Sequence, residues 1–110
     1  MTVTANVNVK NYEIITVGEG TTYLETTSES PIFCKFTPNY TNTYKIYSSD
    51  SSGDPDVVVY DEDGQRITDD NTTGDFDVEV SMTKGKTYYI KYDEWSKAQV
   101  YHTTLNIEQR

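Results

Sequence analysis

The types of side chain in this chain constrain its fold more than any other feature. Val, Ile, Thr, Tyr, Phe and Trp supply 48 of the 110 residues, whereas Ala, Leu and Met together supply six. β-Branched and aromatic side chains lose rotamer freedom on a helix, but they pack well on the pleated surface of a sheet. No segment shows the 3.6-residue apolar period with capping residues that marks a helix. We therefore expect an all-β protein without a substantial helix.

Segments with strand character alternate with turn sequences at short spacing, as in a sandwich or barrel. Residues 76–82 show the clearest pattern, because apolar and polar side chains alternate there and so point to opposite faces of a strand. The predicted strands cover residues 12–17, 21–25, 31–36, 43–48, 57–60, 65–68, 76–82, 86–92 and 99–107, and residues 3–9 are a further candidate for a first edge strand. We predict an antiparallel two-sheet β-sandwich of eight or nine strands, formed as a single domain over residues 1–110.

Apolar residues of these strands should form one hydrophobic core. The expected contributors are Phe36, Ile46, Val58, Val78, Val80 and Ile90. The continuous apolar run over residues 57–60 predicts a central strand that is buried on both faces. Cys34, the single cysteine, lies in the apolar run PIFCKF, which favours a buried core residue over a reactive thiol.

Charge is concentrated in one part of the chain. The formal net charge is −9, and residues 50–80 carry 11 of the 18 acidic residues but a single base, Arg66. Such an acidic chain argues against a nucleic acid partner, whose phosphates require a basic surface. The sequence has no run of 18 apolar residues for a membrane span. It also begins without the pattern of a signal peptide, which a domain cut from a larger secreted protein would have lost.

The inventory of reactive residues argues against an enzyme. His102 is the only histidine, and no strained, glycine-flanked turn presents a serine for a catalytic triad. Zinc sites with several His or Cys ligands are excluded by count, and no glycine-rich loop is suited to a phosphate. We interpret His102 as a structural or surface residue.

Aspartates are frequent in the segments that connect the predicted strands of residues 50–75. Calcium prefers six to eight oxygen ligands from flexible loops, and loops at one end of a sandwich converge in space. One interpretation is a Ca²⁺ site that uses some of Asp54, Asp56, Asp69 and Asp70. The other is that these residues form turns and keep the domain soluble, because Asp, Asn, Ser and Gly are common turn residues and no EF-hand spacing is completed. We favour the second interpretation.

Exposed aromatic rings are a second candidate feature, because the faces of sugar rings stack on them. Trp95 lies in the polar segment DEWSK, and together with Tyr40 and Tyr101 it is a candidate contact patch for a ligand. The alternative is that Trp95 folds back and covers the end of the sandwich, and we favour this alternative.

The middle and the end of the chain resemble the bacterial pre-peptidase C-terminal domain family. The resemblance covers residues 33–107 and rests on a strand, an aspartate-rich hairpin, a further strand and a GKTYYI strand in the family's order. The matching segments are Thr43-Tyr44, Asp54-Pro55-Asp56, Tyr60-Asp61, Asp63-Gly64, Asp69-Asp70 and Gly85–Ile90. The chain departs from the family at Asn42, where glycine is common, but asparagine also tolerates a positive φ.

The resemblance implies a jelly-roll-like sandwich attached to a secreted hydrolase or a cell-surface protein. Such domains are associated with secretion, with stability, or with the binding of a substrate such as collagen or a polysaccharide. In relatives that bind collagen, calcium is held by acids near an N-terminal linker, and the first 20 residues here offer only Glu13 and Glu19.

We therefore predict a non-catalytic, extracellular or cell-surface accessory module. It would bind a polymer (a collagen-like protein or a polysaccharide) or position a neighbouring domain, and we expect a monomer. An Ig-like stalk or adhesin repeat without a ligand of its own is the alternative.

Overall fold

The computed structural model describes residues 14–26, 31–95 and 100–110, and the edge strand predicted over residues 3–9 lies outside them. The described residues contain strands at every other position predicted from the sequence. These strands are β1 (Ile14–Val17), β2 (Gly20–Thr26), β3 (Ile32–Phe36), β4 (Asn42–Ser49), β5 (Pro55–Tyr60), β6 (Arg66–Asp70), β7 (Asp77–Met82), β8 (Tyr88–Glu94) and β9 (Tyr101–Gln109). The described part of the chain holds no helix long and apolar enough to cross a membrane.

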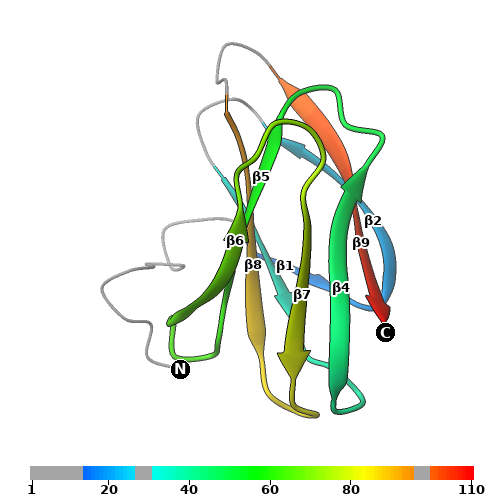
Figure 1. Ribbon diagram of the computed structural model, residues 1–110, viewed down its shortest axis with the longest axis vertical. Helices are drawn as coiled ribbons and strands as arrows, with labels where there is room; N and C mark the ends of the chain where they lie inside the picture. The colour runs from blue at the N-terminus through cyan, green and yellow to red at the C-terminus, as the bar shows by residue number, and fades with distance from the viewer. Residues whose placement is uncertain (1–13, 27–30, 96–99) are drawn as a thin grey trace.

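Two sheets face each other and form the predicted β-sandwich (Figure 1). One sheet has five strands in the order β1-β3-β8-β5-β6, and the other has four in the order β2-β9-β4-β7. From β2 onward the chain passes to the opposite sheet after each strand, except at the β5–β6 hairpin. This order is that of a jelly roll, in which two Greek keys form a double sheet, as the family resemblance implied.

One pair of strands departs from the antiparallel arrangement that we predicted. β1 and β3 are parallel, with Ile14 opposite Phe33 and Val17 opposite Phe36. The topology explains this pairing, because β1 and β3 belong to one sheet and β2, which runs between them along the chain, belongs to the other. Two reversals of direction therefore separate β1 from β3.

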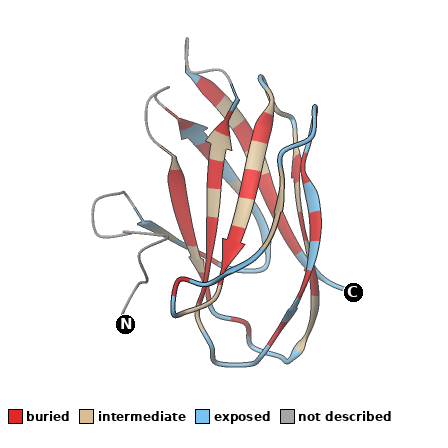
Figure 2. Ribbon diagram, turned by 60° about the vertical axis from the view of Figure 1, so that its left-hand side comes forward, coloured by how far each residue is buried: buried red, intermediate tan, exposed pale blue. Residues whose placement is uncertain are grey.

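The core fills the space between the sheets. Buried and more exposed residues alternate along the strands, as the bands of colour in Figure 2 show. Five of the predicted core residues are confirmed, namely Phe36, Ile46, Val78, Val80 and Ile90. The core also holds aromatic rings, and Phe36 meets Tyr44 edge-on at 5.4 Å between ring centroids. The Tyr44 hydroxyl donates a hydrogen bond to the carbonyl of Tyr40 at 2.6 Å, so the one polar atom of this buried side chain is satisfied.

The prediction of Val58 as a core residue is wrong. Val57 and Val59 face the core, and Val58 is half-buried on the outer face, where it packs against a small cluster of Phe33, Tyr60 and Tyr89. Side chains alternate along a strand, so only every second valine can reach the core. The sequence of three consecutive valines does not show which of them face the core.

The β5–β6 hairpin forms as its sequence predicts. Gly64 has a φ of 82°, which glycine adopts without steric cost. The turn is closed by a hydrogen bond from the amide of Asp61 to the carbonyl of Gln65 at 2.9 Å, and by a second one from the amide of Gly64 to the carbonyl of Asp61 at 3.0 Å.

Cys34 is a buried core residue, as predicted, and none of its surface is exposed. Burial raises the pKa of its thiol to about 12, so the reactive thiolate does not form at neutral pH. We expect the native protein to leave a thiol reagent such as Ellman's reagent unconsumed over minutes, and the protein in concentrated guanidinium to consume one equivalent. Rapid reaction under native conditions would contradict this placement.

Candidate functional site

The four predicted calcium ligands lie at the end of the sandwich where the β4–β5 and β6–β7 loops turn (Figure 1). Asp54 belongs to the β4–β5 loop, but Asp56 lies within β5, and Asp69 and Asp70 lie within β6. The sequence had placed Asp56, Asp69 and Asp70 in loops, and this is wrong. β5 and β6 extend further towards this end than their apolar residues indicate, because cross-strand pairing continues to Val57 opposite Asp70.

Hydrogen bonds within the loops already occupy two of these carboxylates. Asp54 accepts a hydrogen bond from the amide of Gly74 at 2.9 Å, which ties the β4–β5 loop to the β6–β7 loop. Asp70 accepts from the amide and the hydroxyl of Thr72 and from the amide of Asp77, at 3.0, 2.7 and 3.0 Å. Burial alone would raise the pKa of Asp70, but these hydrogen bonds outweigh it and lower the pKa.

The other two aspartates differ from each other. Asp69 pairs with Arg66 at 2.6 Å on the surface. Asp56 has a buried carboxylate oxygen, Oδ1, without a hydrogen-bond partner. Burial and the nearby charges of Asp54, Asp93, Glu94 and Asp70 raise the pKa of Asp56 to about 6. The ionised carboxylate of Asp56 therefore lowers the stability of the folded domain at neutral pH.

A metal would need several of these oxygen atoms to converge. Within residues 14–26, 31–95 and 100–110, no three His, Cys, Asp or Glu residues are grouped so that they could hold a metal ion. Calcium binding at Asp54, Asp56, Asp69 and Asp70 thus stays a prediction of the sequence. The structure supplies another role for Asp54 and Asp70, which is to order the two loops.

A buried glutamate lies beside this acidic end. Glu94 accepts a hydrogen bond from the Tyr92 hydroxyl and another from the amide of Asp54, the latter at 2.8 Å. Gly53 lies against the pair of Glu94 and Tyr101, since a Cβ on Gly53 would come within 2.5 Å of an atom of each. A side chain at position 53 would therefore have to displace Glu94 and Tyr101.

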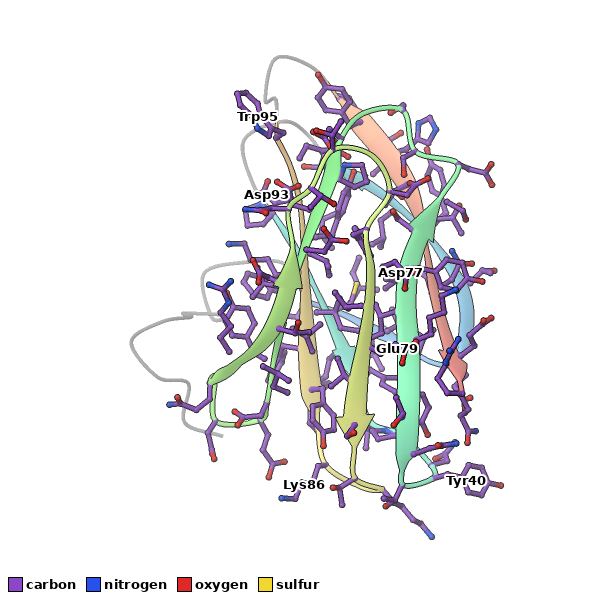
Figure 3. The ribbon with its side chains drawn as sticks, in the orientation of Figure 1. Tyr40, Asp77, Glu79, Lys86, Asp93 and Trp95 are labelled. Atoms are coloured by element: carbon purple, nitrogen blue, oxygen red, sulfur yellow. The ribbon has the colours of Figure 1, made fainter. Side chains whose placement is uncertain are left out.

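The structure does not bring the three predicted contact aromatics together. Trp95 and Tyr40 lie at opposite ends of the sandwich (Figure 3), and Tyr101 is buried. The interpretation that Trp95 folds back over the end of the sandwich is also wrong, because 72% of this residue is exposed. Whether Trp95 or Tyr40, which is 63% exposed, contacts a ligand stays a prediction.

A different aromatic site lies on the outer face of the four-stranded sheet. There Tyr23 is 60% exposed, and its ring stacks on that of His102 with 5.7 Å between centroids and 28° between planes. The Tyr23 hydroxyl donates a hydrogen bond to Glu25 at 3.2 Å. Glu25 lies opposite His102, and Tyr23 lies opposite Thr104. We call the surface formed by Tyr23, Glu25, His102 and Thr104 the Tyr23 face.

β9 is held on both sides at the histidine of this face. β9 pairs with β2 on one side, and on the other side the amide of His102 donates to the hydroxyl of Ser52 at 2.9 Å. The amide of Ser52 in turn donates to the carbonyl of His102 at 3.0 Å. The β4–β5 loop thus continues the sheet and fixes the position of the histidine beside Tyr23.

The Tyr23 face was not predicted from the sequence. Tyr23 and His102 belong to strands at opposite ends of the chain, and only the register of β2 with β9 makes them neighbours. One available signal was the alternation of Tyr23 and Glu25 with the apolar Leu24, which places both polar side chains on the solvent side.

Comparison with known proteins establishes the fold. The chain is similar to the pre-peptidase C-terminal domain of a collagenase from Bacillus anthracis, with a TM-score of 0.67 and 12% identity over 88% of this chain and 96% of that one. It is also similar to a periplasmic inhibitor of g-type lysozyme from Aeromonas hydrophila, with a TM-score of 0.57 and 14% identity over 87% of this chain and 98% of that one. No protein-family model and no curated protein sequence matches the chain.

Asp56 should make the stability of the domain depend on pH. The pKa of Asp56 is about 6 in the folded state, against 3.8 for an unperturbed aspartate. Because the folded state binds the proton more tightly than the unfolded state, the free energy of unfolding falls as pH rises from 3.8 to 6. We expect Asp56→Asn to raise the free energy of unfolding at pH 7 by about 1 kcal/mol, after allowance for solvent screening, but not at pH 3.5. Urea unfolding at the two pH values measures this difference.

The exposed residue Asp63 offers the matched control for this experiment. Asp63→Asn removes the same charge without relieving a buried carboxylate, so we expect little change at either pH. Equal effects of the two substitutions would contradict a specific role for Asp56.

Asp70 tests the two interpretations of the acidic end. Asp70→Ala removes three hydrogen bonds, so we expect the free energy of unfolding to fall by about 1–2 kcal/mol. The loss should be the same in EDTA and in millimolar calcium if the carboxylate only orders the loop. A loss that appears only with calcium, shared by Asp69→Ala, would instead support a metal site.

Proposed function

We propose that this chain is a non-catalytic binding module of a larger secreted or cell-surface protein, and that it attaches that protein to a polymer through the Tyr23 face. The similar domain from Bacillus anthracis belongs to a collagenase. The lysozyme inhibitor with the same fold is periplasmic. Both likenesses support a location outside the cytoplasm and a fold that serves as an accessory or binding unit.

The observation that carries this proposal is the exposed stack of Tyr23 on His102. Aromatic residues are enriched where proteins contact partners, since they offer a large rigid area at a low cost in conformational entropy. Six of the tyrosines in the described part of the chain are buried, whereas Tyr23 presents its ring to solvent from a regular strand. An exposed ring on the outer face of a sheet suits an extended ligand that passes over it.

A protein partner is the second candidate, and one observation favours it. Residues 50–80 carry 11 acidic residues and one base, and many of them lie on β5, β6, β7 and their loops. Such a charged side of the molecule would attract a basic protein. The similar lysozyme inhibitor shows that this fold occurs in a protein that acts on another protein.

Retention on immobilised polymers tests the proposal. We expect the purified domain to be retarded on at least one gel from a set of gelatin, fibrillar collagen, cellulose, xylan and chitin, and we expect Tyr23→Ala to reduce this retardation. Ile67→Ala, which removes an exposed apolar side chain from β6 of the other sheet, is the control. A domain that passes through all five gels unretarded would support the stalk without a ligand and overturn the proposal.

A further inference from the structure

We infer that the polymer recognised by the Tyr23 face is an uncharged polysaccharide, which deepens the proposed function and rests on it. The inference combines the exposed ring, the polar groups around it and the charge of the face. The ring and the polar groups favour a carbohydrate over a protein, and the charge favours a neutral polymer over an acidic one.

The ring stack provides a platform for a sugar ring. His102 packs against Tyr23, and the Tyr23 hydroxyl is held by Glu25, so the tyrosine ring is fixed in orientation before a ligand arrives. The exposed part of Tyr23 is then available to the C–H face of a sugar. Such preorganisation reduces the entropy lost on binding.

Polar groups that suit hydroxyls surround the platform. The Glu25 carboxylate and the His102 ring lie opposite each other on neighbouring strands. On the other side, the row from Tyr23 continues through Thr104 to Ser49 on β4, which places hydroxyl side chains over about 10 Å across three strands. A carbohydrate bears hydroxyls around the whole ring, so it can pair with donors and acceptors placed along such a row.

The charge of the sheet's outer face argues against an acidic polymer. Glu25, Glu79, Asp77 and Glu108 lie on the strands of this sheet. Lys45 pairs with Asp77 at 3.7 Å and Arg110 with Glu79 at 3.2 Å, which leaves Glu25 and Glu108 without an ion pair among those described. A uronic acid or sulfated chain would meet these carboxylates without a free base opposite it, and like charges across an interface are costly.

The polarity of the Tyr23 face also argues against a protein as its ligand. A stable protein interface buries more than about 1,000 Å² and has an apolar centre. Of the large hydrophobic residues exposed in the described part of the chain, only Tyr23 lies within a strand of the four-stranded sheet. One aromatic ring in a polar surround matches a hydroxyl-covered chain better than it matches an apolar protein surface.

Native electrophoresis through gels that contain a soluble polysaccharide tests this inference. The neutral probes are hydroxyethyl cellulose, galactomannan and glycol chitin. Polygalacturonate is the acidic probe, and gelatin is the protein probe. We expect retardation by at least one neutral probe and none by polygalacturonate. Tyr23→Ala and His102→Ala should each weaken the apparent affinity about tenfold or more, whereas Tyr23→Phe, which retains the ring, should weaken it less.

Ile67→Ala, which removes an exposed apolar side chain from β6 of the five-stranded sheet, serves as the control, and circular dichroism confirms that each variant is folded. Retardation by gelatin alone, lost in Tyr23→Ala, would overturn the polysaccharide inference and leave the proposed function intact. Retardation by a neutral probe that Tyr23→Ala leaves unchanged would overturn the role of the Tyr23 face. The absence of retardation by every probe would overturn both the inference and the proposed function.

Discussion

Packing of alternate side chains between the two sheets determines where every other side chain of this protein points. Each described strand except β6 places at least one buried apolar residue in the shared core. Leu24 on β2 and Leu105 on β9 lie in this layer, so their neighbours Tyr23 and Thr104 must face outwards. A slip of one residue in β2 would bury Tyr23 and expose Leu24, and a slip in β9 would expose Leu105, which the hydrophobic effect strongly disfavours. The core therefore holds the proposed binding face in register.

The sequence predicted the strands well because their signal is local. Alternation such as that of β7 depends only on neighbouring residues, and the turn at Gly64 depends on one glycine with a positive φ. The parallel pairing of β1 with β3 depends instead on which sheet each strand joins. The phase of Val57, Val58 and Val59 depends on the partners of β5. Neither property is encoded in a short stretch of sequence.

The candidate sites were harder to predict than the fold. The acidic end was found because its aspartates are close in sequence, yet their hydrogen bonds to Gly74, Thr72 and Asp77 required the loop geometry. Trp95 was misjudged because we favoured a ring folded back over the end of the sandwich, although the polar residues around it in the sequence agree with its exposure. Trp95 is exposed but stands apart from Tyr40, whereas Tyr23 and His102 meet only through the pairing of β2 with β9. A surface formed by strands that are distant in sequence can be predicted only when the pairing of those strands is known.

The charged edge strands have a consequence for the behaviour of the domain at high concentration. An exposed edge offers unpaired main-chain groups on which a second chain can add a strand, and this is a common route to aggregation. β6 carries Asp69 and Asp70 near its end, and β7 carries Asp77 and Glu79. Two copies that approached through these edges would bring their carboxylates together. The acidic residues of β6 and β7 thus disfavour edge-to-edge association at one edge of each sheet.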